Sequence, residues 1–188
     1  MAFPVHRSLA ATARAACLAW ILWWAPAWAA PPANEYQVKA VYLFNFGQFV
    51  EWPAQAYDSA TAPFGICIVG EDPFGKVLED VVRGESLNGR NLLVKRFADP
   101  ASIDDCNIVF VGRNEADLLD RTLRALQGRS VLTVTDIEGA EHRGAVIALF
   151  NENNRIRMRI NLAAARASNL VISSKLLRPA EIVGGEGS

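Results

Sequence analysis

After residue 29 the chain is poor in the residues that hold metals and carry out most hydrolytic chemistry. It has one histidine, His142, and two cysteines, Cys67 and Cys106. A structural zinc site takes four nitrogen or sulfur ligands, so we expect no metal site and no cofactor. Hydrolases pair a nucleophile with a base, and His142 lies in a polar stretch between two predicted strands. We therefore expect no catalytic residues and a protein that is not an enzyme.

The sequence also lacks an excess of positive charge, a linker and a long apolar run. Residues 30–188 carry 17 Lys and Arg against 20 Asp and Glu, a formal charge of −3, which argues against a nucleic-acid-binding protein. No stretch rich in Gly, Ser or Pro divides these residues, so one domain with a single core is expected. No apolar run reaches the roughly 20 residues needed to cross a bilayer.

The first 29 residues have the three parts of a secretory signal peptide. Arg7 and Arg14 form a basic start, residues 15–25 are apolar, and Ala27-Trp28-Ala29 has the small-x-small form of a cleavage site. We therefore predict a signal peptide at 1–29, a mature domain at 30–188, and export to the periplasm.

Two cysteines in an exported chain favour a disulfide, because the space outside the cytoplasm is oxidising. A bond between Cys67 and Cys106 would close a loop of about 40 residues and stabilise the domain by roughly 4 kcal/mol. Two separate buried thiols are the alternative. A redox switch would require a strained or exposed bond, and the sequence is compatible with either a structural or a switching role.

Short apolar runs alternate with helical patterns along most of the domain. Strands are expected at 64–69, 92–97, 108–111 and 131–134, and helices at 38–52, 74–82 and 115–126. Three of the four runs are continuous rather than alternating, as in strands buried on both faces. This order favours an α/β fold with a mostly parallel sheet sandwiched by helices.

The last third of the domain has a different pattern. Residues 145–150 are apolar, 155–160 alternate strictly, and 151–154 form a turn between them, which predicts an antiparallel hairpin at one edge of the sheet. Three apolar residues of the second strand should face inward and three arginines outward: Ile156, Met158 and Ile160 against Arg155, Arg157 and Arg159. A short helix at 162–167 with Asn161 as its cap, an extended piece at 171–173 and a final segment at 176–183 follow.

Two features are candidate partner or ligand surfaces. Three guanidinium groups about 6 to 7 Å apart on one strand face could bind an anion or an acidic partner, although a solvated edge that discourages strand pairing is the alternative. The helix at 38–52 has more aromatic residues than one core stripe needs, so it could line a pocket or a dimer contact, with core packing as the alternative. The candidate residues are Arg155, Arg157, Arg159, Phe44, Phe49, Trp52 and Lys175.

Several segments together resemble the YfiR family of exported regulators. They are Val38-Lys39-Ala40 through Phe49-Val50-Glu51-Trp52-Pro53, Ile66 to Gly70 with Pro73-Phe74, Cys67 and Cys106 before Ile108-Val109-Phe110-Val111, and Ile160-Asn161 with Ala163-Ala164 leading to Ile172-Ser173-Ser174-Lys175-Leu176-Leu177. The resemblance covers essentially all of residues 30–188. It implies a non-enzymatic periplasmic homodimer that represses an inner-membrane diguanylate cyclase by binding its periplasmic sensor part, and so lowers cyclic-di-GMP.

The resemblance carries two further expectations. It implies an outer-membrane lipoprotein partner and a disulfide at the positions of Cys67 and Cys106, while the second cysteine pair that some members have in the later hairpin region is missing from this chain. Members of this group also occur beside other signalling or transport proteins, and a fold does not determine a partner. The alternative function is therefore a periplasmic small-molecule-binding module that serves another membrane sensor or transport system, with the aromatic helix and an arginine as its pocket.

Overall fold

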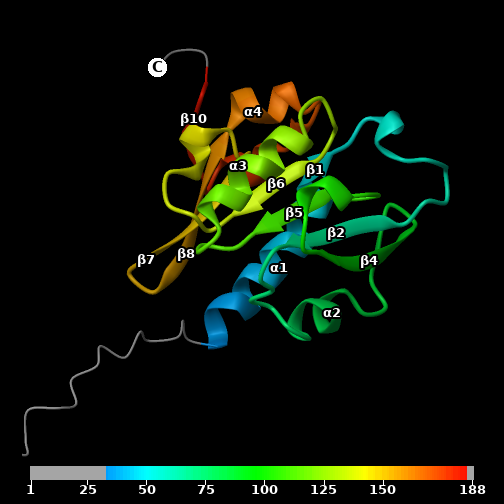
Figure 1. The fold of residues 1–188 in the computed structure, drawn as a ribbon, viewed down its shortest axis with the longest axis horizontal. Helices are drawn as coiled ribbons and strands as arrows, with labels where there is room; N and C mark the ends of the chain where they lie inside the picture. Colours follow the sequence, from blue (N-terminus) through cyan, green and yellow to red (C-terminus); the bar gives the residue numbers. More distant parts are fainter. Residues whose placement is uncertain (1–32, 186–188) are drawn as a thin grey trace, which may run out of the picture. The chain divides into compact units, whose positions relative to one another are not determined.

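A computed structural model describes residues 33–185 as an α/β fold built on an eight-stranded sheet (Figure 1). The predicted signal peptide, residues 1–29, lies outside the described residues. None of the described helices has the length and apolar character needed to cross a membrane.

The described residues form helices, 3-10 turns and strands. The helices are α1 (Ala33–Phe49), α2 (Val77–Val82), α3 (Ala116–Ala125), α4 (Leu162–Ala167) and α5 (Ser174–Leu177), and the 3-10 turns are η1 (Ala54–Ala56), η2 (Pro100–Ser102) and η3 (Ala140–Arg143). The strands are β1 (Val50–Glu51), β2 (Phe64–Val69), β3 (Ser86–Leu87), β4 (Arg90–Phe97), β5 (Ile108–Val111), β6 (Leu132–Thr135), β7 (Ile147–Glu152), β8 (Arg155–Asn161), β9 (Val171–Ile172) and β10 (Glu181–Val183).

The large sheet has the strand order β10-β8-β7-β6-β5-β2-β4-β3. In the run β4-β2-β5-β6-β7, every pair of neighbouring strands is parallel. At the two ends of this run, β8 pairs antiparallel with β7 and β3 pairs antiparallel with β4. The predicted mostly parallel α/β fold with a C-terminal hairpin is confirmed. The hairpin is not outermost along its whole length, because β10 pairs with residues 159–161 of β8. A separate two-stranded sheet joins β1 to β9.

Apolar side chains fill both faces of the sheet. Alternate residues of β2 and β5 pack on one face with α1 and α2, where Phe46, Ile66 and Phe110 are fully buried. The opposite residues of the same strands pack on the other face with α3, where Val109 and Leu119 are buried. Every residue of β2 and β5 is therefore buried, which is the physical reason that these strands appear in the sequence as continuous apolar runs.

The predicted helix at 38–52 is wrong at both ends. α1 begins at Ala33 and ends at Phe49, and the next two residues extend as β1, where Val50 pairs with Ile172. The predicted helix at 74–82 starts later, at Val77. The residues before it form a turn instead, because Asp72 accepts a hydrogen bond from the Phe74 backbone N–H at 2.8 Å. Local apolar spacing does not distinguish a last helical turn from a short strand.

The C-terminal hairpin follows the predicted pattern. Asn153 and Asn154 both have positive φ, at 52° and 61°, and form the two-residue turn, a conformation that Asn tolerates and that suits the strand twist. Met158 is buried on the α1 side of β8, so the arginines point to the opposite face. The helix at 162–167 is also confirmed as α4, and the Asn161 side chain caps it by accepting a hydrogen bond from Ala164 N at 2.9 Å.

Candidate functional site

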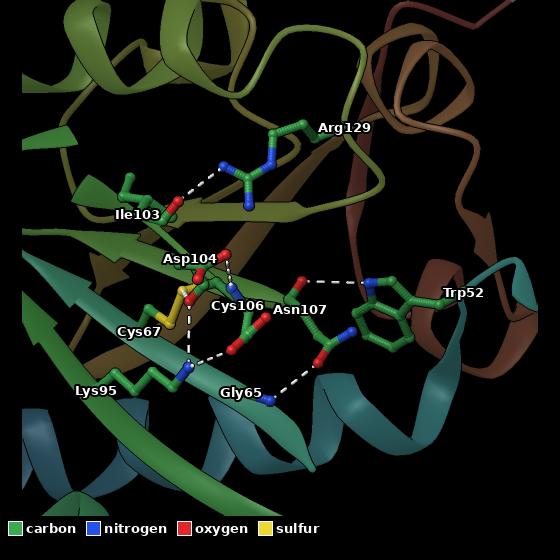
Figure 2. Close-up of a disulfide and its surroundings, with 10 residues drawn as sticks. Trp52, Gly65, Cys67, Lys95, Ile103, Asp104, Cys106, Asn107 and Arg129 are labelled. Carbon is green, nitrogen blue, oxygen red and sulfur yellow. Dashed lines mark hydrogen bonds and ion pairs between the residues drawn. A yellow bond between two sulfur atoms is a disulfide. The ribbon is translucent and has the colours of Figure 1, made fainter. Parts of the chain in front are cut away.

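The disulfide joins two neighbouring parallel strands. Cys67 lies in β2 and Cys106 lies two residues before β5, and their Cα atoms are 5.9 Å apart (Figure 2). The predicted bond is therefore confirmed. Cys67 is fully buried, whereas Cys106 retains 6% exposure. The enclosed segment contains α2, β3, β4 and η2. The bond therefore links β2 to the start of the adjacent inner strand β5 and closes the loop that carries the edge strand β3.

Asn107 organises the start of β5 beside the disulfide. Its side-chain oxygen accepts a hydrogen bond from Gly65 N at 2.9 Å, and its backbone oxygen accepts one from Trp52 Nε1 at 3.2 Å, as Figure 2 shows. A Cβ atom at Gly65 would lie 2.0 Å from the Asp105 backbone oxygen. Only glycine therefore fits where the two strands approach. Trp52 also packs edge-on against Phe64 at 4.9 Å, so it has a structural role here.

A pocket of about 400 Å³ opens beside the disulfide, and Cys106 forms part of its wall. Its other charged and aromatic lining residues are Tyr57, Asp58, Asp104, Asp105 and Arg129. Lys95 donates a hydrogen bond to Asp105 at 3.2 Å, and this contact holds the pKa of the Asp105 carboxyl below its usual value. Arg129 donates to the Ile103 backbone oxygen at 3.0 Å. The pocket is therefore polar, with more negative than positive groups.

A second cluster of charged residues lies where β5 and β6 end and α1 begins. The Lys39 ammonium is 2.5 Å from Glu35 Oε1 and 2.5 Å from Asp136 Oδ2. Arg113 pairs with both carboxylates, and Tyr36 donates a hydrogen bond to Asp136 at 3.0 Å. Side-chain exposure is 1% for Lys39, 6% for Glu35 and 1% for Asp136. We call these five residues the buried ion network.

Burial and charge act in opposite directions on the groups of the buried ion network. Burial alone would raise the pKa of Glu35, but the hydrogen bond from Lys39 and the positive charges of Lys39 and Arg113 outweigh it and hold that pKa below its usual value. Burial and the charge of Asp136 raise the pKa of Tyr36 to about 12. With two cations and two carboxylates, the network is electrically balanced. It fastens the first turns of α1 to the ends of two central strands.

The buried ion network had no predicted role. Two local indications were present: Lys39 interrupts an apolar helical pattern with Glu35 four residues before it, and Asp136 directly follows a strand. The sequence does not predict that these residues pair, because Lys39 and Asp136 are 97 positions apart in the chain.

The three arginines of β8 share one face, but two of them already have acidic partners. Arg157 is 3.4 Å from Glu152, and Arg159 is 2.8 Å from Glu181. Arg159 also lies over the Phe150 ring at 4.0 Å. Arg155 is exposed, and no carboxylate of residues 33–185 pairs with it. We call this side of β8 the arginine face.

The aromatic candidates lie away from the arginine face. Phe44, Phe49 and Trp52 are partly buried and pack against the core on the α1 side of the sheet, which agrees with the core-packing alternative. Lys175 is exposed in α5. The Phe49 backbone oxygen accepts a hydrogen bond from Ser173 N at 2.9 Å, so α5 starts next to the end of α1. The sequence candidates thus form two groups rather than one site.

A sequence model of the YfiR/HmsC-like family matches residues 36–181. The chain belongs to this family. The match spans most of the helix α1, the disulfide, every residue of the buried ion network except Glu35, and the arginine face, and it confirms the resemblance read from the sequence.

Comparison with solved structures gives a partial likeness. The crystal structure of a conserved domain protein from Vibrio cholerae O1 biovar El Tor is 12% identical, with a TM-score of 0.48 over 63% of this YfiR/HmsC-like chain and 54% of that one. The chain thus spans about half the length of that protein. No curated protein matches the chain.

Proposed function

We propose that this YfiR/HmsC-like protein is a periplasmic regulator that binds the periplasmic sensor part of an inner-membrane diguanylate cyclase and represses it. The family match over residues 36–181 carries the proposal. The predicted signal peptide at 1–29 supports the location. The proposal includes a homodimer, a second partner in the form of an outer-membrane lipoprotein, and action by binding rather than by catalysis.

The arginine face is the proposed contact with the cyclase. Arg155 has no acidic partner among the described residues, and the Arg157 ion pair with Glu152 joins two half-exposed side chains, at 44% and 49% exposure. Exposed ion pairs contribute little to stability, so Arg157 can exchange Glu152 for a carboxylate of the partner at little cost. Alanine at Arg155 or Arg157 should weaken the complex more at low salt than at high salt.

Cellular cyclic-di-GMP in the native host tests the function. The gene is deleted, then restored either as the full chain or without residues 1–29. A rise in cyclic-di-GMP on deletion that only the full chain reverses would support periplasmic repression. An unchanged level on deletion, or reversal by the form without residues 1–29, would contradict it.

A small-molecule sensor is the second candidate, favoured by the pocket of about 400 Å³ beside Cys106. Its volume lies in the range of small-molecule sites. In this case the ligand would bind between Arg129 and the aspartates rather than at the aromatic helix. A thermal-shift screen of periplasmic metabolites should then find a compound whose stabilisation is lost in Arg129→Ala. The same shift in wild-type protein and variant would exclude this pocket.

A further inference from the structure

A groove of about 650 Å³ is lined by residues of α3 and α4. Its lining residues Leu123, Leu126 and Val131 belong to the core on the α3 side of the sheet, whereas Ala164 of α4 packs against the core on the α1 side. Its lining combines apolar and charged residues: Leu123, Leu126, Val131, Ala164 and Ala167, together with Asp120, Arg124 and Arg143. Leu126 and Val131 are buried, whereas Arg124 and Arg143 are exposed, so we take the charged residues as the rim. Several of these side chains are small, and Gly128 and Gly144 also line the groove. The hollow therefore has room for an apolar side chain from outside.

The rim of the groove has one uncompensated positive charge. Arg143 is engaged, since it lies 2.5 Å from Asp120 and donates to the Ala116 backbone oxygen at 3.0 Å. Arg124 is exposed, and none of the ion pairs between described residues involves it. An apolar floor beside a free guanidinium complements an apolar side chain next to a carboxylate.

The turn η3 links the groove to the arginine face. The arginines of β8 lie on the sheet face opposite α1, because Met158 and Ile160 point to the α1 side, and the α3 wall of the groove lies on that same face. The turn η3 connects them: Arg143 pairs with Asp120 of α3, while its neighbour Glu141 is 3.7 Å from Arg159 of β8. One partner surface can therefore cover the arginine face and reach the groove.

We propose that the groove between α3 and α4 receives a large apolar side chain from an acidic segment of the membrane cyclase's periplasmic part. A carboxylate next to that side chain in the partner would pair with Arg124. This inference rests on the proposed function and adds the site and the chemistry of the partner segment. The apolar side chain anchors the complex in a desolvated hollow, as contact centres do, and the arginines of β8 align the acidic surface around it.

Two variants of the groove test the inference in the host strain that lacks the gene. Ala167→Trp fills the hollow from an exposed position at the end of α4, and Arg124→Glu reverses the rim charge. Their matched controls are Ala125→Trp and Arg121→Glu, exposed positions on α3 that do not line the groove. Each full-length protein is produced from a titratable promoter, and cyclic-di-GMP is plotted against the periplasmic protein level measured by immunoblot.

Both groove variants should need about tenfold more periplasmic protein than wild type for half-repression, a shift that corresponds to about 1.4 kcal/mol of binding. The two controls should follow the wild-type curve. If deletion raises cyclic-di-GMP and both groove variants repress at the wild-type level, the groove is not the contact, although the proposed function stands. If deletion leaves cyclic-di-GMP unchanged, the proposed function is wrong, and so is the proposal that a cyclase segment binds the groove.

Discussion

Replacement of Lys39 by methionine should lower the free energy of unfolding by about 3 to 5 kcal/mol. The ammonium lies 2.5 Å from both Glu35 and Asp136, and all three side chains are at least nine-tenths buried. Methionine has a similar length, so the variant removes the charge with little change in packing. Among the described residues, the two buried carboxylates would then have Arg113 as their one cationic partner, and its side chain is 38% exposed.

The size of the expected loss follows from the uncompensated charge. Breaking a buried ion pair by removing one partner costs several kcal/mol, because the remaining charge stays in a poorly solvated site. At about 2 to 4 °C per kcal/mol for a domain of this size, the melting temperature should fall by roughly 10 °C. Adding Glu35→Gln to Lys39→Met should recover part of the loss, since it removes one of the two unpaired carboxylates. The coupling between the two substitutions should be about 1 kcal/mol or more.

Urea unfolding of the purified protein measures these values. Trp52 is the one tryptophan of residues 30–188, and its indole donates to the Asn107 backbone, so its fluorescence reports loss of the fold. Lys76→Met is the control, because Lys76 is exposed, and it should change stability by less than about 0.5 kcal/mol. A loss below about 1 kcal/mol in Lys39→Met would refute the buried ion network as a stabilising element.

Three further predictions concern the disulfide, its neighbour and pH. Serine at both Cys67 and Cys106 should cost roughly 4 kcal/mol in urea unfolding, and a loss under about 1 kcal/mol would contradict a stapling role. Asn107→Ala leaves the Gly65 N–H without its acceptor and should cost about 1 to 3 kcal/mol; an unchanged urea midpoint would refute this. Because its pKa is lowered on folding from 4.5, Glu35 contributes stability above about pH 4.5 that is lost as pH falls through the folded pKa. The urea midpoint of Glu35→Gln should therefore change less between pH 5 and pH 3 than that of the wild type. An equal change in both proteins would contradict this role of Glu35.

The elements that were predicted correctly are those that local physics determines. β2 and β5 match their predicted bounds because buried parallel strands are apolar at every position. The helix α4 matches because Asn161 is a good N-cap and the next six residues favour a helix. The inward and outward sides of β8 follow from strict alternation alone.

The errors arise where a distant segment decides the local structure. Residues 50–51 were assigned to the first helix, and they form a strand because β9, about 120 residues later, pairs with them. The three residues of β10 follow Pro179 and are too few to show a period, yet they extend the sheet beyond Arg159. The same pairing gives Arg159 an acidic partner, Glu181, which the arginine pattern in β8 does not reveal.

The sequence by itself determined the family, the types of most elements, and the cysteine pair, because composition, periodicity and motif order are local properties of the chain. The tertiary structure alone decided which charges meet. Lys39 finds Asp136, and Arg143 joins α3 to the turn before β7, only after the strands have taken their order in the sheet. The groove between α3 and α4 exists for the same reason: these two helices are more than 30 residues apart in the chain, and no local pattern encodes the space between them.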